Sequence, residues 1–289
     1  MTFMKRITIL FIFFIFCFQT LSVKAAGDSL DGHAVWRSFL HQFVNENGDV
    51  NYAGVKRNPA LLNDYLAFIA AQNPVDVKTL WPREKAMAFW INAYHAGVIK
   101  IVVDHYPARS LNQISSAWDI TVIHVGAEQY SLNQIRNQIL MKTYRDEKIH
   151  LALSCGARGC PRLDRDPFTD ANVEGKLFLA TREFLNDPAR VEIIPGKKTI
   201  RLSRIFKWYG ADFNLDFGTP ERIGKFSREE MSILSFLIYY SEDLQKIEFL
   251  EEGRYKIKYM PFDPELNDWI DAPPVSDHSL QYELPGEPK

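Results

Sequence analysis

The sequence predicts an α+β protein: a helix-rich single domain with a small, mainly antiparallel sheet around a buried central helix. Segments with helical spacing and short alternating strands are interspersed, without the regular strand–helix rhythm of a parallel sheet. One long segment, residues 83–106, has a middle that is apolar nearly all round, which is typical of a buried helix. The chain has 289 residues and is 46% hydrophobic, so it can bury a core as one large domain or two small ones.

The first 25 residues have the layout of a secretory signal peptide. Lys5 and Arg6 precede an apolar run from Ile7 to Phe18, and small residues end at Ala25, where we expect cleavage. An uncleaved membrane anchor is the alternative, but the apolar run is shorter than the roughly 20 residues that cross a bilayer. The sequence therefore predicts an exported protein, periplasmic or secreted, that is soluble and has no membrane span after cleavage.

Two helices form a predicted N-terminal lead-in over residues 26–77. Apolar residues at helical spacing begin at Asp31 and stop at the Asn- and Gly-rich turn "NENGDVNY". A second helix is predicted from Asn58 to Ala71, and Pro82 fits the first turn of the long buried helix.

The remaining elements follow from alternation, helical spacing and turn residues. They are a hairpin in "WDITVIHVGAEQYSL", a helix in "SLNQIRNQILMKT", a strand in "KIHLALS", a helix from Asp170 to Asn186, a hairpin in "RVEIIPGKKTIRLS", a short helix in "RIFKWYGADF", a helix from Ser227 to Tyr240 and a strand in "RYKIKYM". The tail from Phe262, above all residues 268–289, is rich in Pro and acid and is predicted to be mobile.

The charge balance argues against nucleic acid as a partner. The full chain has 34 Lys and Arg against 36 Asp and Glu, and loss of the leader removes Lys5, Arg6 and Lys24. The mature chain is therefore mildly acidic, and no basic stripe runs along it.

The mature chain keeps two cysteines, Cys155 and Cys160, in "IHLALSCGARGCPRL". They are structural thiols or a disulfide, for which Gly156 and Gly159 allow a tight loop, or at least one of them is a functional thiol. The spacing fits neither a thioredoxin-type motif nor a zinc knuckle, and we predict no metal site. In a regular strand, His150 and Cys155 would point to opposite faces.

Other polar residues are candidates for a site or for a buried network. In the long helix, Asn92 and His95 lie on the same stripe of the helix surface. They either form a structural hydrogen-bond network in the core or line a cleft. Arg158 could stabilise a thiolate at Cys155. The aromatic segment "FKWYGADF" contributes Trp208, Tyr209 and Asp212, of which Asp212 could orient a histidine as in a nucleophilic triad. The sequence has no phosphate loop, serine elbow or zinc-protease helix, and we predict no cofactor.

Four segments resemble one family: "FWINAYHAGVIK", "SLNQIRNQIL" followed by "KIHLALSCGARGCPRL", "IFKWYGADF" and "IKYMPFDPELND". Their order and spacing are similar to those of the domain-of-unknown-function family 547, exported bacterial members included, over roughly Lys78 to Asn267. The resemblance implies no settled activity. The family's hallmark positions fall on Asn92, Tyr94, His150, Cys155, Cys160, Pro161, Trp208 and Tyr209.

The chain departs from the family's pattern at two places. Relatives tend to have Asn where this chain has His95, which puts an essential catalytic role of His95 in doubt. They have Tyr-Asp-Trp where this chain has Phe262-Asp263-Pro264, which puts the role of that segment in doubt. A buried helix followed by a histidine-bearing segment is also distantly similar to papain-like and transglutaminase-like folds.

The sequence leaves two hypotheses for the function, a binding or scaffold protein and an enzyme. The first is a non-catalytic binding or scaffold domain of the cell envelope, whose partner is a peptide, protein or glycan. The alternative is a thiol-dependent hydrolase or transferase that uses Cys155 as nucleophile, His150 or His95 as base and Asn92 or Asp212 as orienting group. The second hypothesis requires a free Cys155, whereas the first allows it to be buried or paired.

Overall fold

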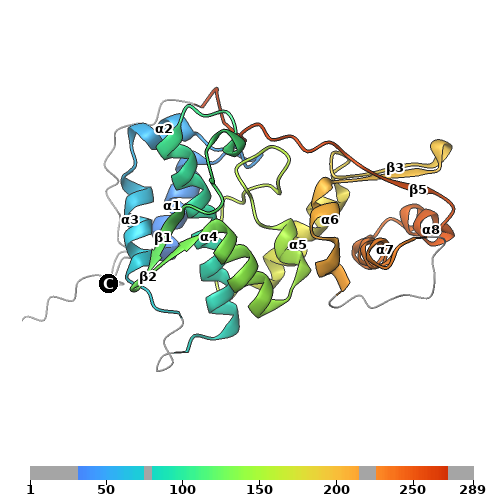
Figure 1. Ribbon diagram of the computed structural model, residues 1–289, viewed down its shortest axis with the longest axis horizontal. Coiled ribbons are helices and arrows are strands. Elements are labelled where there is room, and N and C mark those ends of the chain that lie inside the picture. Colours follow the sequence, from blue (N-terminus) through green and yellow to red (C-terminus); the bar gives the residue numbers. More distant parts are fainter. Residues whose placement is uncertain (1–31, 75–79, 215–225, 273–289) are drawn as a thin grey trace, which may run out of the picture.

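A computed structural model describes residues 32–74, 80–214 and 226–272, and Figure 1 shows their arrangement. The fold class is confirmed: the chain is helix-rich, with two small sheets. The predicted signal peptide, residues 1–25, lies outside the described residues. The helices are α1 (Gly32–Phe43), α2 (Tyr52–Arg57), α3 (Ala60–Ala70), α4 (Arg83–His105), α5 (Val173–Asn186), α6 (Arg204–Trp208), α7 (Arg228–Tyr240) and α8 (Leu244–Glu252).

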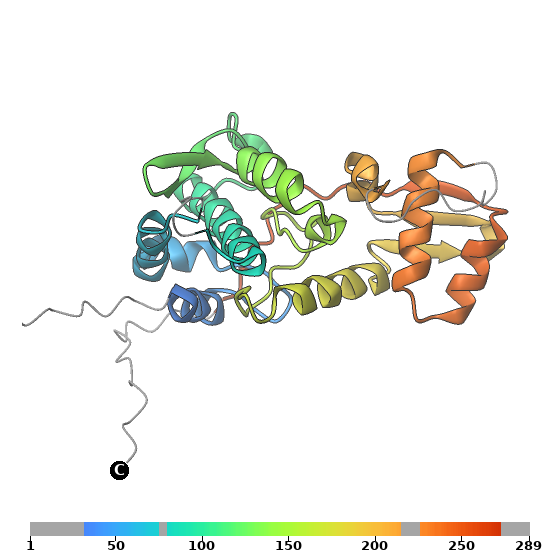
Figure 2. The same ribbon diagram turned by 90° about the horizontal axis from the view of Figure 1, so that it is seen from below.

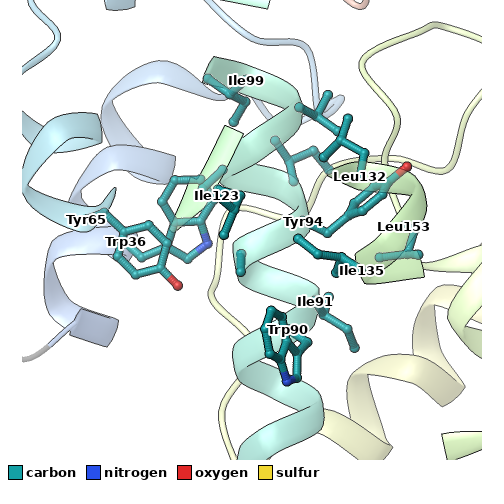
Figure 3. Packing of buried hydrophobic residues seen from close by; sticks show 14 of the residues in the cluster. Trp36, Tyr65, Trp90, Ile91, Tyr94, Ile99, Ile123, Leu132, Ile135 and Leu153 are labelled. Atoms are coloured by element: carbon teal, nitrogen blue, oxygen red, sulfur yellow. The ribbon is translucent and has the colours of Figure 1, made fainter. Parts of the chain in front are cut away.

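Helix α4 is the centre of a first hydrophobic core. It packs against α2, α3 and an antiparallel hairpin of β1 (Thr121–Val125) and β2 (Glu128–Ser131), and α1 packs on α3. Figure 3 shows Trp36 of α1 and Tyr65 of α3 on one side, and their rings stack at 4.6 Å. By length and composition α4 could cross a membrane, but most of it is buried inside the protein, as its apolar circumference predicts.

The segment before the first cysteine differs from its prediction. "KIHLALS" was expected to be a strand, but residues Glu147–Leu151 form the short 3-10 helix η3. Asp146 begins η3, and its side chain accepts a hydrogen bond from the backbone N–H of Lys148. A short aliphatic run fits a buried helical turn as well as a strand, so this cap decided the outcome. The preceding predicted helix is a π-helix, η2 (Gln134–Tyr144).

Helix α5 connects the first hydrophobic core to a second one (Figure 2). Its N-terminal half packs in the first core and its C-terminal end packs in the second. The second core packs α6, α7 and α8 against a three-stranded sheet of β3 (Val191–Ile194), β4 (Thr199–Leu202) and β5 (Lys256–Tyr259). The β3–β4 pair is antiparallel, as its hairpin sequence predicts, whereas β4 and β5 are parallel. The apolar residues are thus buried in two clusters, of which one surrounds the predicted central helix.

The C-terminal chain returns to the first core, which corrects the prediction of a mobile segment from Phe262 and of a tail from residue 268. Asn267 is buried and accepts a hydrogen bond from the Tyr52 hydroxyl. Asp268 accepts one from Tyr106, and the N–H of Trp269 donates to Val50. These partners, distant in sequence, order the segment despite its polar composition, while residues 273–289 lie outside the described residues.

Candidate functional site

A pocket of about 330 Å³ lies where the two cores meet, and we call it the aromatic pocket. Its walls come from α4, η2, η3, the cysteine loop, α6 and the chain after β5. It is lined by Tyr94, Asn112, Trp118, Arg136, His150, Leu153, Cys155, Cys160, Pro161, Ile205, Trp208, Tyr209 and Phe262. Aromatic rings with a few polar groups are the usual composition of a small-molecule site.

His150 and Asp212 form the tightest polar contact beside the pocket. His150 Nε2 lies 2.6 Å from Asp212 Oδ2, and the imidazole stacks on the Tyr209 ring at 4.1 Å with an interplanar angle of 6°. Helix η3 supplies the histidine, and the 3-10 turn η5 (Gly210–Asn214) after α6 supplies the aspartate. The "WYGAD" segment therefore provides both the stacking ring and the carboxylate.

Burial lowers the pKa of His150 below its ordinary value, and the hydrogen bond and charge of Asp212 partly oppose this effect. The imidazole is therefore neutral near pH 7. We assign its proton to Nε2, because this atom faces the carboxylate. The Nδ1 atom is buried and has no hydrogen-bond partner among the described residues. An unprotonated Nδ1 can accept a proton, so the pair has the chemistry of an oriented base.

Arg136 of η2 is the cation that lines the pocket in the described part of the chain. Its guanidinium donates to the side-chain oxygens of Asn133 at 2.8 Å and Asn137 at 3.0 Å. It lies 5.2 Å from the centroid of the Tyr209 ring and 5.9 Å from that of Trp118. These contacts fix a planar donor group against aromatic faces.

Cys155 and Cys160, for which a disulfide was one of the possibilities left open by the sequence, are joined in the structure, with Cα atoms 5.6 Å apart. Gly156, inside the loop, has a φ of +75°, and a Cβ there would lie 2.9 Å from Val98, so the tight loop requires glycine. Arg190 holds the loop from outside. Its guanidinium donates to the carbonyl oxygens of Arg158, Gly159 and Cys160 at 2.6, 2.8 and 2.9 Å.

Cys155 and His150 line the same pocket, which corrects the expectation that they point to opposite faces. The reason is the 3-10 helix η3, because strand alternation does not apply to it. Trp208 also lines the pocket; it is 50% exposed and its ring centroid lies 4.9 Å from that of Phe262. The structure thus brings together Cys155, Cys160, His150, Trp208, Tyr209 and, through His150, Asp212.

Asn92 and His95 do not line the aromatic pocket. Asn92 bonds the backbone of Phe168 twice: its Nδ2 donates to the carbonyl at 2.7 Å and its Oδ1 accepts from the N–H at 3.1 Å. His95 Nε2 accepts from the N–H of Ser154 at 3.1 Å, and burial lowers the pKa of His95 to about 4. Both side chains connect α4 to the chain packed against it.

Arg158 does not line the aromatic pocket. It lines a second hollow of about 270 Å³, and its guanidinium pairs with Glu265 at 3.2 Å. Sequence reasoning missed Arg136, Trp118 and Asn112. The segment "SLNQIRNQIL" was interpreted only as a helix and as a family segment. It did contain a signal, because Arg136 lies between the asparagines Asn133 and Asn137 in the sequence.

Among residues 32–74, 80–214 and 226–272, no group of three or more His, Cys, Asp or Glu side chains could hold a metal ion.

Fold and site together define an α+β protein with an aromatic pocket that is walled on one side by a disulfide loop. Residues 78–185 match the model of the family described as protein of unknown function, DUF547. The match ends in α5, and the predicted boundary at 267 stays a prediction. No curated protein and no solved structure matches the chain, so the distant papain-like similarity also stays a prediction.

Proposed function

We propose that this protein is an exported, soluble binding domain of the cell envelope that holds a ligand in the aromatic pocket without transforming it. One observation carries the proposal. The pocket contains an oriented base, His150, but its two cysteine sulfurs are bonded to each other. A disulfide sulfur cannot act as a thiolate nucleophile, so among the described residues the predicted catalytic set lacks its attacking group.

Export is part of the proposal and is supported by the N-terminal leader and by the cysteine pair. Disulfides persist in oxidising compartments such as the periplasm and are rare in the cytosol.

The pocket also has the features of a preformed binding site. Its aromatic walls are fixed by stacking, and the cysteine loop is held by the disulfide and by Arg190. Rigid walls reduce the entropy that a ligand has to overcome on binding.

The experiment compares the oxidised mature protein with the same protein after reduction. Ligand-observed NMR against soluble envelope glycan and peptide fragments measures binding, and activated esters, thioesters and amides measure turnover. A binding domain binds in the oxidised form and turns over none of the substrates in either form. Binding that is lost in Trp208→Ala, which removes a half-exposed ring at the pocket, assigns the ligand to this pocket.

A thiol-dependent hydrolase or transferase is the second candidate, favoured by the shared pocket of Cys155, His150 and Asp212. A dithiol reductant would supply two electrons and two protons and give two thiols. Cys155 would then lose its proton to His150, and the thiolate would form a bond to a carbonyl carbon. The bond from that carbon to the leaving group would break, the leaving group would take the proton from His150, and water or an acceptor would release the acyl group from Cys155. Turnover that appears only after reduction and disappears in Cys155→Ser would establish this function and exclude the first.

A further inference from the structure

We infer that the aromatic pocket binds an acidic sugar of an envelope glycan and that Arg136 is the residue that pairs with the carboxylate of this sugar. The inference rests on the proposed binding function and names the ligand class of that site. Three features of the pocket carry it: a cation that pairs with no carboxylate of the described residues, ring faces around that cation, and a compact shape.

Arg136 is positioned for an anion that the described part of the chain does not supply. Its guanidinium donates to two neutral asparagine oxygens and lies against the rings of Tyr209 and Trp118. No carboxylate oxygen among the described residues pairs with it, and its side chain is only partly buried. A planar guanidinium held in this way binds a carboxylate through two parallel hydrogen bonds.

The neighbouring ionisable groups do not compete for that role. His150 is neutral, as argued above, and the carboxylate of Asp212 already accepts its hydrogen bond. Tyr94 keeps its proton because burial raises its pKa to about 12. Among the described residues, Arg136 is therefore the positive charge that lines the pocket, and a ligand with one carboxylate matches it.

The rest of the lining favours a sugar over a peptide. Trp118, Trp208 and Phe262 offer apolar ring faces, against which the C–H faces of a pyranose pack, and the exposed amide of Asn112 can bond hydroxyl groups. The lining residues come from helices, turns and loops, so the pocket offers no strand edge to which an extended peptide could add. Its volume of about 330 Å³ suits one ring with its substituents better than an extended chain.

The test uses two sugars that share a ring and an acetamido group: N-acetylmuramic acid, which carries a carboxylate, and N-acetylglucosamine, which does not. Titrations followed by NMR of the oxidised mature protein should show the acidic sugar binding about tenfold more tightly. Arg136→Gln should remove that preference and leave the affinity for the neutral sugar unchanged. Arg83→Gln is the matched control, because Arg83 lies 5.1 Å from the Tyr144 ring outside the pocket.

Each other outcome overturns the inference. Equal affinity for the two sugars, or a preference that survives in Arg136→Gln, removes Arg136 as the carboxylate partner while the binding function can stand. Binding of acetylated dialanine in place of either sugar assigns a peptide ligand and rejects the glycan. Failure of both sugars to bind rejects the ligand class. Turnover after reduction would refute the proposed function. The sugar preference is measured on the oxidised form, so the two tests fail independently.

Discussion

His150 Nε2 and Asp212 Oδ2 lie 2.6 Å apart although 62 residues separate them in the chain. One residue comes from η3 and the other from the 3-10 turn η5 after α6. The contact joins the segments that carry the two hydrophobic cores, and it sets the tautomer of the histidine that lines the pocket.

Asp212→Asn should lower the pKa of His150 further. Both effects of Asp212, its hydrogen bond and its charge, raise this pKa, so without them burial acts unopposed. An NMR titration of the His150 ring measures the change. Asp104→Asn, which removes a carboxylate paired with Lys100 on the surface, should leave the titration unchanged. A higher pKa of His150 in Asp212→Asn would contradict the assigned contact.

Acidification should destabilise the protein through His95. Burial lowers its pKa from 6.5 to about 4, so the unfolded chain takes up the proton first as the pH falls. The free energy of unfolding should therefore fall as the pH falls from 6.5 to 4, by about 3 kcal/mol from this residue if the shift is fully expressed.

Denaturant unfolding at pH 7 and at pH 4.5 measures the His95 effect. His95→Asn keeps a polar group at the position but does not titrate, so its stability should depend less on pH than that of the unchanged protein. Some dependence should remain, because the pKa of His150 is lowered too. The same pH dependence in both proteins would show that His95 is not the responsible group.

Replacing both cysteines, as Cys155→Ser with Cys160→Ser, should lower the free energy of unfolding by about 2 kcal/mol, the loop-closure value for a short loop. Adding a reductant to the unchanged protein should have a similar effect, since residues 26–289 contain no other cysteine. Equilibrium unfolding in urea measures both. If stability is unchanged in both experiments, the disulfide does not contribute to the fold.

Arg190→Gln should cost on the order of 2 kcal/mol, because three carbonyl oxygens of the cysteine loop lose a charged donor. Arg201→Gln is the matched control. Arg201 pairs with Glu192 across β3 and β4 on an accessible part of the sheet, so this change should cost less than about 1 kcal/mol. Equal losses in the two variants would remove the special role of Arg190.

Asn92 and Asn112 should separate stability from binding. Asn92→Ala leaves the N–H and carbonyl of Phe168 without their buried partner and should cost about 3 kcal/mol, with ligand affinity unchanged in the folded protein. Asn112→Ala, at an exposed position of the pocket, should weaken ligand binding with little loss of stability. Thermal unfolding and the sugar titration measure the two effects, and the reverse pattern would move Asn92 into the site.

The sequence by itself determined the elements with strong local patterns. The apolar circumference of residues 83–106 fixed α4 as a buried helix, and the turns at Gly126 and Pro195–Gly196 fixed the two hairpins. These patterns are local, since side-chain periodicity and turn residues act over a few positions. The hallmark positions His150, Cys155, Trp208 and Tyr209 were also named from the sequence, and all four line one pocket.

Only the tertiary structure decided which of the candidates share a site. The sequence left Asn92 and His95 open as members of a cleft, and both are instead bonded to the backbone packed against α4. It placed His150 and Cys155 on opposite faces, because a short aliphatic run does not distinguish a strand from a 3-10 turn. Arg136 became a candidate only when the fold placed its helix against Tyr209. Contacts between distant segments depend on how the two cores pack, and no local pattern in the chain encodes that packing.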